Sequence, residues 1–125
     1  MRITCGTDII EVKRIQDAIE NIGETFLNKI YTKKEIEYCI NKKEMKYQHL
    51  AARFAAKEAI YKAISYLLKD KYEITWTDVE VCNDENGKPY VNFLNNKPKE
   101  IEQIDISLSH IKEYAIANCA VITSK

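Results

Sequence analysis

The stretch from about His49 to Leu68 constrains the fold more than any other part of the sequence. It contains no glycine or proline and is rich in alanine and leucine, so it predicts a long α-helix. At about 100° per residue, a bulky face forms. That face consists of Leu50, Phe54, Tyr61, Ile64 and Leu68. The opposite face is made of small residues, namely Ala51, Ala52, Ala55, Ala59 and Ala63. Because a helix that is apolar on nearly all sides is buried, we expect another element to pack closely against the alanines.

Shorter elements precede this helix. Residues 3–9 alternate as a strand does, and one face of that strand carries Ile3, Cys5, Thr7 and Ile9. Gly6 interrupts the pattern, which indicates a bulge or the close approach of another backbone. Helical spacing follows from about Glu11 to the stop signal at Gly23. Residues 32–35 have the T-x-x-E form of a capping box, so a short helix is expected to about Asn41. The polar residues 41–46 predict a mobile loop.

Strand patterns dominate after Tyr72. Residues 76–82 and 90–93 flank a turn at 83–87, and residues 104–109 alternate between apolar and polar. The apolar run 114–122 is typical of a strand buried on both faces. Helices followed by antiparallel strands, with the N-terminal strand joining them, indicate an α+β fold whose antiparallel sheet packs on the long central helix. No repeat or linker divides the chain, so we expect a single domain over residues 1–125.

Charge and hydropathy exclude several classes of protein. Lys and Arg number 19, as do Asp and Glu, so the net charge is zero and a uniformly basic nucleic-acid-binding surface is excluded. A local basic patch is still compatible with this balance. No apolar run reaches the roughly 18 residues of a membrane span, and the N-terminus leads into no signal-peptide core. The four cysteines are scattered without a C-x-x-C pair, which predicts reduced thiols and a cytoplasmic protein.

Glu58 and Lys62 are unusual because they lie between the two apolar faces of the predicted helix, one turn apart. An unpaired buried carboxylate costs several kcal/mol, and an ion pair between these two residues is the simplest remedy. Asp8 also lacks a local partner, and its simplest role is to cap the helix that begins near Glu11. Alternatively, Asp8 and Glu58 bind Mg²⁺ together with a phosphate ligand, since this ion usually takes one or two carboxylates plus phosphate oxygens. Spacing alone does not bring Asp8 and Glu58 together.

A family resemblance supplies that link. The motifs G-T-D-I-I-E-x-x-R-I at residues 6–15 and R-F-A-A-K-E-A-x-x-K-A at residues 53–63 resemble the signature pair of the 4′-phosphopantetheinyl transferases. The chain length is similar to that of the short, trimeric branch, the holo-[acyl-carrier-protein] synthases. W-x-D-V-E-V at 76–81, N-G-K-P-Y-V at 86–91 and I-S-L-S-H at 106–110 also fit, in order along the chain.

The resemblance implies both the fold of this family and its reaction. The phosphopantetheine arm of coenzyme A is transferred to a serine of acyl carrier protein, and adenosine 3′,5′-bisphosphate is released. Asp8 and Glu58 match the carboxylates that hold Mg²⁺ in the family. Lys62 then either stands against the phosphates as a point charge or, with a lowered pKa, takes the serine proton. A water activated by Glu58 or by the metal is a third candidate base, and the sequence does not choose among them.

The remaining matches concern coenzyme A and the protein partners. Ser109 and His110 match the family block near the coenzyme phosphates, although a histidine that ends a strand is often merely packed. Residues 87–89 (Gly87, Lys88 and Pro89) match the segment that approaches the nucleotide, and a plain hairpin turn explains them as well. Arg53 is expected either to reach the 3′-phosphate of a coenzyme bound at its own or at a neighbouring subunit, or to snorkel to water. Arg14 matches a position that docks acyl carrier protein, and the family implies a homotrimer with active sites at subunit boundaries.

Two features depart from the family pattern. Ser65-Tyr66-Leu67 replaces glycines that commonly follow the second motif, and the first helix carries Asp17, Glu20 and Glu24 where an acidic partner would favour bases. Two other functions remain open from the residues alone: a metal-dependent hydrolase of the coenzyme A pyrophosphate, and a non-catalytic module that binds coenzyme A. Nucleic-acid binding and membrane association are not expected.

Overall fold

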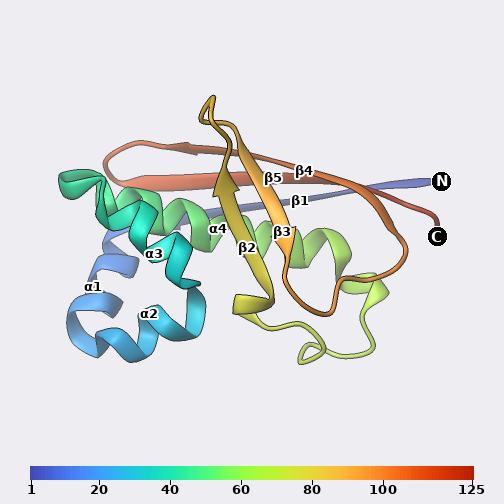
Figure 1. Ribbon diagram of the computed structural model, residues 1–125, viewed down its shortest axis with the longest axis horizontal. Helices are drawn as coiled ribbons and strands as arrows, with labels where there is room; N and C mark the ends of the chain where they lie inside the picture. Colours follow the sequence, from blue (N-terminus) through green and yellow to red (C-terminus); the bar gives the residue numbers. More distant parts are fainter.

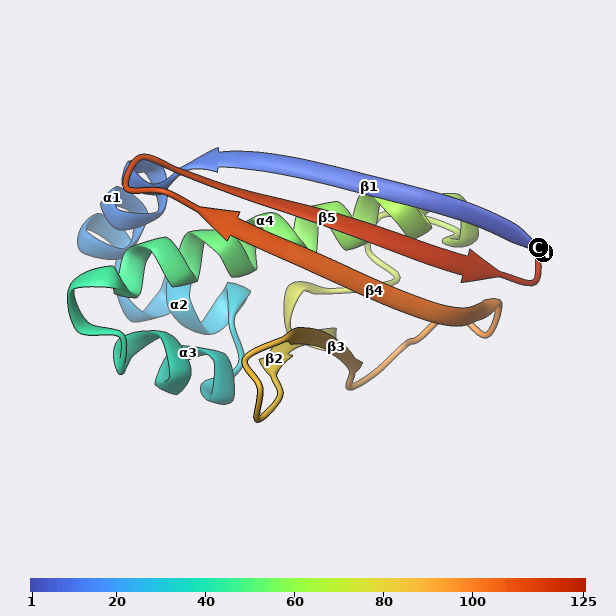
Figure 2. The same cartoon turned by 90° about the horizontal axis from the view of Figure 1, so that it is seen from above.

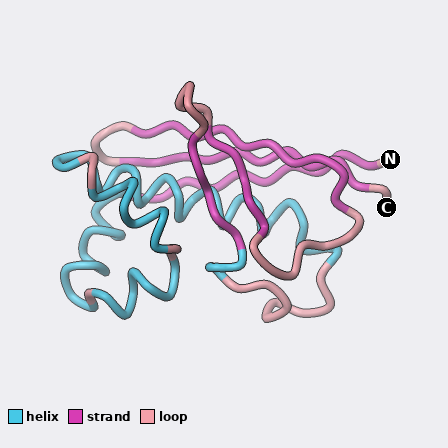
Figure 3. Tube along the Cα trace, in the orientation of Figure 1, coloured by secondary structure: helices cyan, strands magenta, loops and turns pink.

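A computed structural model describes residues 1–125 as an α+β fold in which helices gather at one end and strands run across a long helix (Figures 1 and 3). The elements are β1 (Arg2–Glu11), α1 (Val12–Ile22), α2 (Glu24–Ile30), α3 (Lys33–Ile40), α4 (Lys46–Ile64), β2 (Val79–Asn83), β3 (Pro89–Phe93), β4 (Ile101–His110) and β5 (Tyr114–Thr123). Single 3₁₀ turns, η1 (Lys43–Met45), η2 (Ser65–Leu67) and η3 (Trp76–Asp78), flank α4 and precede β2. None of the helices combines the length and apolar composition that crossing a membrane requires.

The strands form two antiparallel sheets. The larger has the order β1-β5-β4, so the N-terminal strand pairs with the C-terminal one, with Gly6 opposite Cys119. The smaller is the β2–β3 hairpin, which lies beside β4 (Figure 2). The long helix α4 lies under the larger sheet, as expected for a central helix. In consequence β1 and β4 are the two opposite edges of the larger sheet.

The strand β1 packs directly on the alanine side of α4. Ala55, Ala59 and Ala63 are buried there, and their small side chains let the strand approach. The contact is so close that a Cβ atom on Gly6 would lie 1.8 Å from the Ala59 carbonyl oxygen. Of the two alternatives expected at Gly6, the structure shows the close backbone approach and not a bulge, since the register with β5 is unbroken there. This approach sets the height of β1 over the helix. The side chain of Thr4 fixes the register by donating to the Ala63 carbonyl, at 2.8 Å.

The outer face of the larger sheet is exposed. On β1 the residues that face out are Ile3, Cys5, Thr7 and Ile9, and the isoleucines are 68% and 61% exposed. On β5 burial alternates strictly over residues 114–121, with Ile116 paired across to Ile9. The prediction that residues 114–122 are buried on both faces is therefore wrong for this chain on its own. The outer side chains are apolar because of strand propensity or because another surface covers them.

Three local predictions also need correction. The helix α2 was not anticipated: Gly23 adopts a φ of +82°, ends α1, and a second helix starts at the next residue. Residues 41–46 are not an open loop, because the η1 turn leads straight into α4. The long helix accordingly runs over Lys46–Ile64 rather than 49–68, and η2 replaces its last turn. The capping box at Thr32 and Glu35 is present as predicted and starts α3.

Candidate active site

Asp8 and Lys62 meet where β1 crosses α4. The Lys62 ammonium donates to Asp8 Oδ1 at 3.0 Å and to the Thr7 carbonyl at 2.9 Å. Asp8 faces the helix because it shares the inward side of β1 with Gly6. It caps no helix, since Glu11 is the N-cap residue of α1 and no side chain caps that end. The N-cap interpretation of Asp8 is therefore wrong.

Glu58 lies half-buried on α4, one turn before Lys62, but the two do not form an ion pair. None of the salt bridges of the chain includes Glu58. The simple i, i+4 pairing is thus wrong, because Lys62 reaches across to the strand instead. Burial and the nearby Asp8 carboxylate raise the pKa of Glu58 above its ordinary value, and the Lys62 ammonium opposes them. Two carboxylates from distant parts of the chain are therefore close enough to repel each other.

This donor set fits a hard divalent cation. The repulsion between two neighbouring carboxylates raises the pKa of one of them, and a cation bound between the two removes that repulsion. No group of three or more His, Cys, Asp or Glu side chains is placed to hold a metal ion. Asp8 and Glu58 match the one or two carboxylates that Mg²⁺ commonly takes, and the ion fills its other positions with water and phosphate oxygens.

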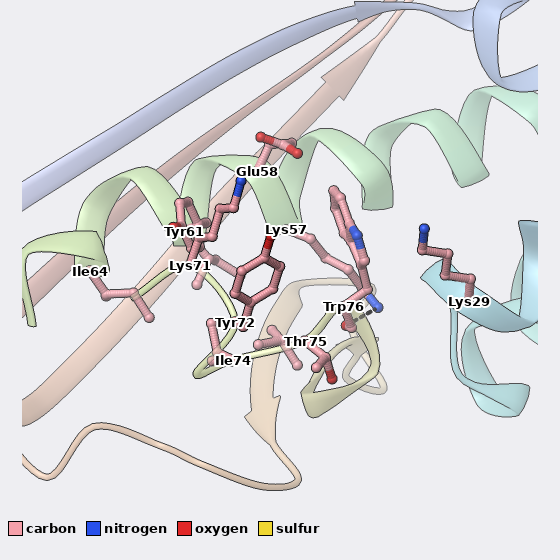
Figure 4. A pocket seen from close by; sticks show the side chains of 12 residues that line it. Lys29, Lys57, Glu58, Tyr61, Ile64, Lys71, Tyr72, Ile74, Thr75 and Trp76 are labelled. Atoms are coloured by element: carbon pink, nitrogen blue, oxygen red, sulfur yellow. Dashed lines mark hydrogen bonds between the residues drawn. The ribbon is translucent and has the colours of Figure 1, made fainter. Parts of the chain in front are cut away.

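Two cavities border Glu58. The smaller, about 280 Å³, lies on the β1 side and is lined by Asp8, Arg14 and Phe54 among others, so Arg14 faces the same opening as the carboxylates. The larger, about 630 Å³, lies on the other side of Glu58 (Figure 4). Its walls are mostly apolar, with Ile60, Tyr61, Ile64, Tyr72, Ile74, Trp76 and Val79, and its charged members are Lys29, Lys57, Glu58 and Lys71. Phe54 stacks on Trp76 at 5.0 Å, between the two cavities. A pocket of this size and character suits a small organic ligand.

Arg53 lies in a different place. Its side chain is only 2% exposed, so it does not snorkel to water. It donates to Asn83 Oδ1 on β2 and lies over the Tyr38 ring at 4.4 Å. Neither contact is with a carboxylate. This residue therefore carries a buried positive charge on the side of α4 that faces the hairpin, away from Glu58.

The other predicted coenzyme contacts lie on the β2–β3 hairpin and on β4. Gly87 has a φ of +85° in the hairpin turn, where Asn83 donates to its carbonyl, and Pro89 begins β3. Lys88 reaches across to β4 and pairs with Asp105 at 2.9 Å, with both side chains exposed. Ser109 is exposed near the end of β4, and His110 ends that strand with its ring 4.9 Å from that of His49.

The predicted site residues thus fall into two groups. The carboxylate group, defined as Asp8, Glu58, Lys62 and Arg14, lies by the β1 edge of the larger sheet. The arginine–histidine group, defined as Arg53, Gly87, Lys88, Pro89, Ser109 and His110, lies by the β4 edge and the hairpin. Because β5 separates the two edges, one chain does not bring both groups to one point.

Sequence reasoning missed a polar network beneath the site. Lys57 Nζ is buried and donates to Glu35 Oε1 at 2.7 Å and to the carbonyls of Ile30 and Trp76. The second oxygen of Glu35 accepts from the backbone of Val81. Glu80, also buried, accepts from Thr32 Oγ1. A lysine among alanines on a helix that is apolar all round was the available signal, since such a lysine needs buried partners.

Comparison with known proteins agrees with this geometry. The holo-[acyl-carrier-protein] synthase of Ruminiclostridium cellulolyticum is 45% identical over 97% of this chain and 92% of its own length. That of Fusobacterium nucleatum is also 45% identical, over 98% and 100%. Among solved structures, the Bacillus anthracis holo-(acyl-carrier-protein) synthase in complex with CoA (3′,5′-ADP) superposes with a TM-score of 0.79 at 33% identity, covering 97% of this chain and 96% of that one. The Helicobacter pylori enzyme in complex with coenzyme A gives 0.83 at 26% identity, covering 94% and 99%.

The sequence model of the family matches residues 4–119, which takes in both motifs and every residue of the two groups. Close relatives over nearly the full length and the shared α+β architecture agree with that match. The chain therefore belongs to the 4′-phosphopantetheinyl transferase superfamily.

Proposed function

We propose that this protein is a holo-[acyl-carrier-protein] synthase, which transfers 4′-phosphopantetheine from coenzyme A to a serine of acyl carrier protein for fatty acid biosynthesis. The second product is adenosine 3′,5′-bisphosphate. The observation that carries the proposal is the meeting of Asp8, Glu58 and Lys62 at the crossing of β1 and α4. Relatives 45% identical over nearly the whole chain bear the name of this activity, and two similar structures hold coenzyme A or part of it.

Asp8 and Glu58 would hold Mg²⁺. When bound, the ion neutralises pyrophosphate charge and orients the leaving group. Lys62 adds a positive charge beside the two carboxylates, and its bonds to Asp8 and the Thr7 carbonyl keep the ammonium directed at this point. Those bonds support a role as a phosphate-binding charge over a role as the base. The apolar cavity on the far side of Glu58 suits the pantetheine arm.

The carrier protein is the expected partner on the β1 side. Arg14 is exposed and borders the cavity that contains Asp8 and Glu58. Acyl carrier protein is strongly acidic, so a basic residue at the rim of this cavity would guide the approaching carrier by electrostatic steering. We place the reaction in the cytoplasm, because the four cysteines are free thiols, as is usual there. The proposed protein is a single domain over residues 1–125.

We further propose that the protein works as a homotrimer with its active sites between subunits. Two facts support assembly: the apolar outer face of the larger sheet is uncovered, and the two groups of site residues lie at opposite edges of that sheet. In a ring of subunits, the β1 edge of one chain meets a different part of the next chain. The carboxylate group of one subunit would then complete its site with the arginine–histidine group of its neighbour.

Intact-mass spectrometry tests the activity. Apo acyl carrier protein is incubated with coenzyme A, Mg²⁺ and the protein, and the expected result is a mass gain of one phosphopantetheine arm that EDTA abolishes. Asp8→Asn and Glu58→Gln keep the shape of each side chain and should lower the rate by about a hundredfold or more, since a bound metal supplies several kcal/mol. Glu102→Gln, an exposed carboxylate on β4, is the matched control and should leave the rate unchanged.

Two outcomes would replace the proposal. Release of adenosine 3′,5′-bisphosphate without any carrier protein indicates a coenzyme A hydrolase. Binding of coenzyme A with no turnover on several carriers indicates a non-catalytic module.

Mixing two inactive variants tests the shared site. Asp8→Asn removes a carboxylate and His110→Ala removes a member of the other group. If each active site draws on two subunits, co-refolded mixtures regain part of the activity because some boundaries carry two intact groups. If each subunit acts alone, the mixtures stay inactive. Light scattering on the same samples reports whether three chains assemble.

A further inference from the structure

The loop between η2 and η3 brings a positive charge to the larger cavity. This loop, residues 68–75, contributes Lys71 and Tyr72 to the cavity wall, and the Lys71 ammonium lies over the Tyr72 ring, 5.2 Å from its centre. The face of an aromatic ring attracts an ammonium at this distance, so the contact holds the charge at the cavity. Figure 4 shows Lys71 on the same side of Trp76 as Glu58, whereas Lys29 lies on the other side of that ring.

Lys71 has no carboxylate partner. None of the salt bridges of the chain includes it. The acidic residues of its own loop are engaged by the loop backbone: Asp70 accepts from the amide of Tyr72 at 2.7 Å, and Glu73 accepts from another amide of the loop at 3.3 Å. Neither of these carboxylates lines the cavity. Glu58 does line it, but in the proposed function Glu58 holds the metal ion. The cavity therefore keeps an unmatched positive charge.

The arm of coenzyme A itself does not use this charge. The pantetheine arm carries amides and a hydroxyl, and it ends in a thiol that is mostly protonated at neutral pH, so it offers no anion to an ammonium. The cavity has a volume of about 630 Å³, within the range that encloses a drug-sized ligand. An arm lengthened by a short acyl group on the sulfur still falls in this size class. An acyl group that ends in a carboxylate would also supply the partner that Lys71 lacks.

We propose that the protein also uses coenzyme A thioesters whose acyl group ends in a carboxylate, and that Lys71 favours them over thioesters with neutral acyl groups. The inference rests on the proposed function, in which the larger cavity receives the pantetheine arm. Lys71 borders only this cavity, whereas Asp8 borders only the smaller one. Lys71 therefore determines specificity by contact with the acyl end of the donor and has no part in the chemistry at phosphorus.

The acyl group stays unchanged during the transfer. The serine oxygen of the carrier attacks the phosphorus that bears the pantetheine arm, and a new P–O bond forms there. The bond from this phosphorus to the bridging oxygen of the pyrophosphate breaks, and adenosine 3′,5′-bisphosphate leaves with the electron pair. The serine proton passes to a base or to water. Because the thioester is not touched, the carrier receives an acylated arm in one step.

Transfer from two matched donors to apo acyl carrier protein, followed by intact-mass spectrometry, tests the proposal. Malonyl-CoA and acetoacetyl-CoA carry acyl groups with equal numbers of non-hydrogen atoms, but the first ends in a carboxylate and the second in a neutral methyl ketone. We would measure kcat/KM for both donors with the wild type, Lys71→Gln and Lys71→Glu. Lys69→Gln is the matched control, since Lys69 is an exposed lysine of the same loop that does not line the cavity. A thermal melt checks that each variant folds.

The ratio of the two kcat/KM values isolates the effect of the charge, because a disturbed fold lowers transfer from both donors alike. The contribution of an exposed ion pair corresponds to about a two- to fivefold change. We therefore expect the malonyl to acetoacetyl ratio to fall by about this factor in Lys71→Gln and further in Lys71→Glu. The change should appear in the KM for malonyl-CoA, with kcat retained, because the contact is the same before and during the reaction. Added salt should lower the wild-type ratio as well.

Four results would contradict the proposal. The first is an unchanged ratio in a folded Lys71→Gln variant. The second is an equal fall in Lys69→Gln, which would show a general effect of surface charge. The third is a wild type that transfers the arm of coenzyme A but neither acylated arm, and this result leaves the transferase intact. The fourth is a wild type that transfers no arm from any donor, which would overturn the proposed function itself.

Discussion

Lys57 and Glu58 are neighbours on α4, yet they belong to two kinds of charged cluster. Lys57 and Glu35 form an ion pair with side chains 2% and 0% exposed, and every donor of the ammonium has a partner. One residue further, Glu58 has no ion-pair partner, and the adjacent pair of Lys62 and Asp8 is 51% and 18% exposed. Figure 4 shows the two side chains leaving the helix in different directions, with Lys57 bonded to the Trp76 carbonyl.

The difference separates structure from function. The buried pair of Lys57 and Glu35 links α2, α3, α4 and the turn before β2. Its two charges neutralise each other, and the Lys57 ammonium donates only to groups of the protein itself. Asp8, Glu58 and Lys62 form a half-exposed cluster, called here the open cluster. Its Glu58 carboxylate has no ion-pair partner, and a cavity lies beside it, so a metal ion and a phosphate can bind there. A buried, satisfied charge stabilises an arrangement, whereas a half-exposed one remains free to bind.

The largest expected effect on stability comes from breaking the buried pair. Lys57→Met leaves Glu35 without its charged partner, and removing one member of a buried ion pair costs about 3–5 kcal/mol. Urea unfolding of the variant and the wild type at equal protein concentration measures this loss. A loss below 1 kcal/mol would mean that the network does not hold these elements together.

Gly6→Ala should have the next largest effect, and it acts on the geometry of the open cluster. The new Cβ has no room beside the Ala59 carbonyl, so β1 must move away from α4 and take Asp8 with it. Overpacking of this kind costs about 1–3 kcal/mol. We expect weaker Mg²⁺ binding by the folded variant, measured as a higher Mg²⁺ concentration for half-maximal transfer. Ile3→Ala on the exposed face of the same strand is the control.

Lys62→Met should change stability least. Its ion pair with Asp8 is partly exposed, and pairs of this kind contribute about 0–1 kcal/mol. The same substitution removes the positive charge next to the carboxylates, so transfer should fall by about tenfold or more while the urea midpoint barely moves. Full activity in a folded Lys62→Met variant would contradict the role given to Lys62. The two lysine variants of α4 are therefore expected to differ: Lys57→Met lowers the free energy of unfolding, whereas Lys62→Met lowers the transfer rate with little change in stability.

Much of the architecture could be predicted from local sequence. The long helix follows from its alanines, the start of α3 from Thr32 and Glu35, and the β2–β3 turn from Gly87, because each depends on residues within a few positions. The helix α2 was missed because a glycine such as Gly23 can end a helical region altogether or form a tight turn between two helices, and the sequence around it does not distinguish the two. Family motifs pointed to Asp8, Glu58 and Lys62, but spacing favoured a local partner for each.

Local sequence was enough to show which residues carry charge on an otherwise apolar helix, and that some other element must pack closely against its alanines. The partners themselves, including β1 as that element, followed from the tertiary fold. It joined Lys62 to Asp8 rather than to Glu58, Lys57 to Glu35, and His49 to His110. These pairs are separated by 54, 22 and 61 residues along the chain, as 62 − 8, 57 − 35 and 110 − 49 give. Local propensity acts over one or two turns, whereas a partner at such separations is chosen by how the β1-β5-β4 sheet and the hairpin pack around α4.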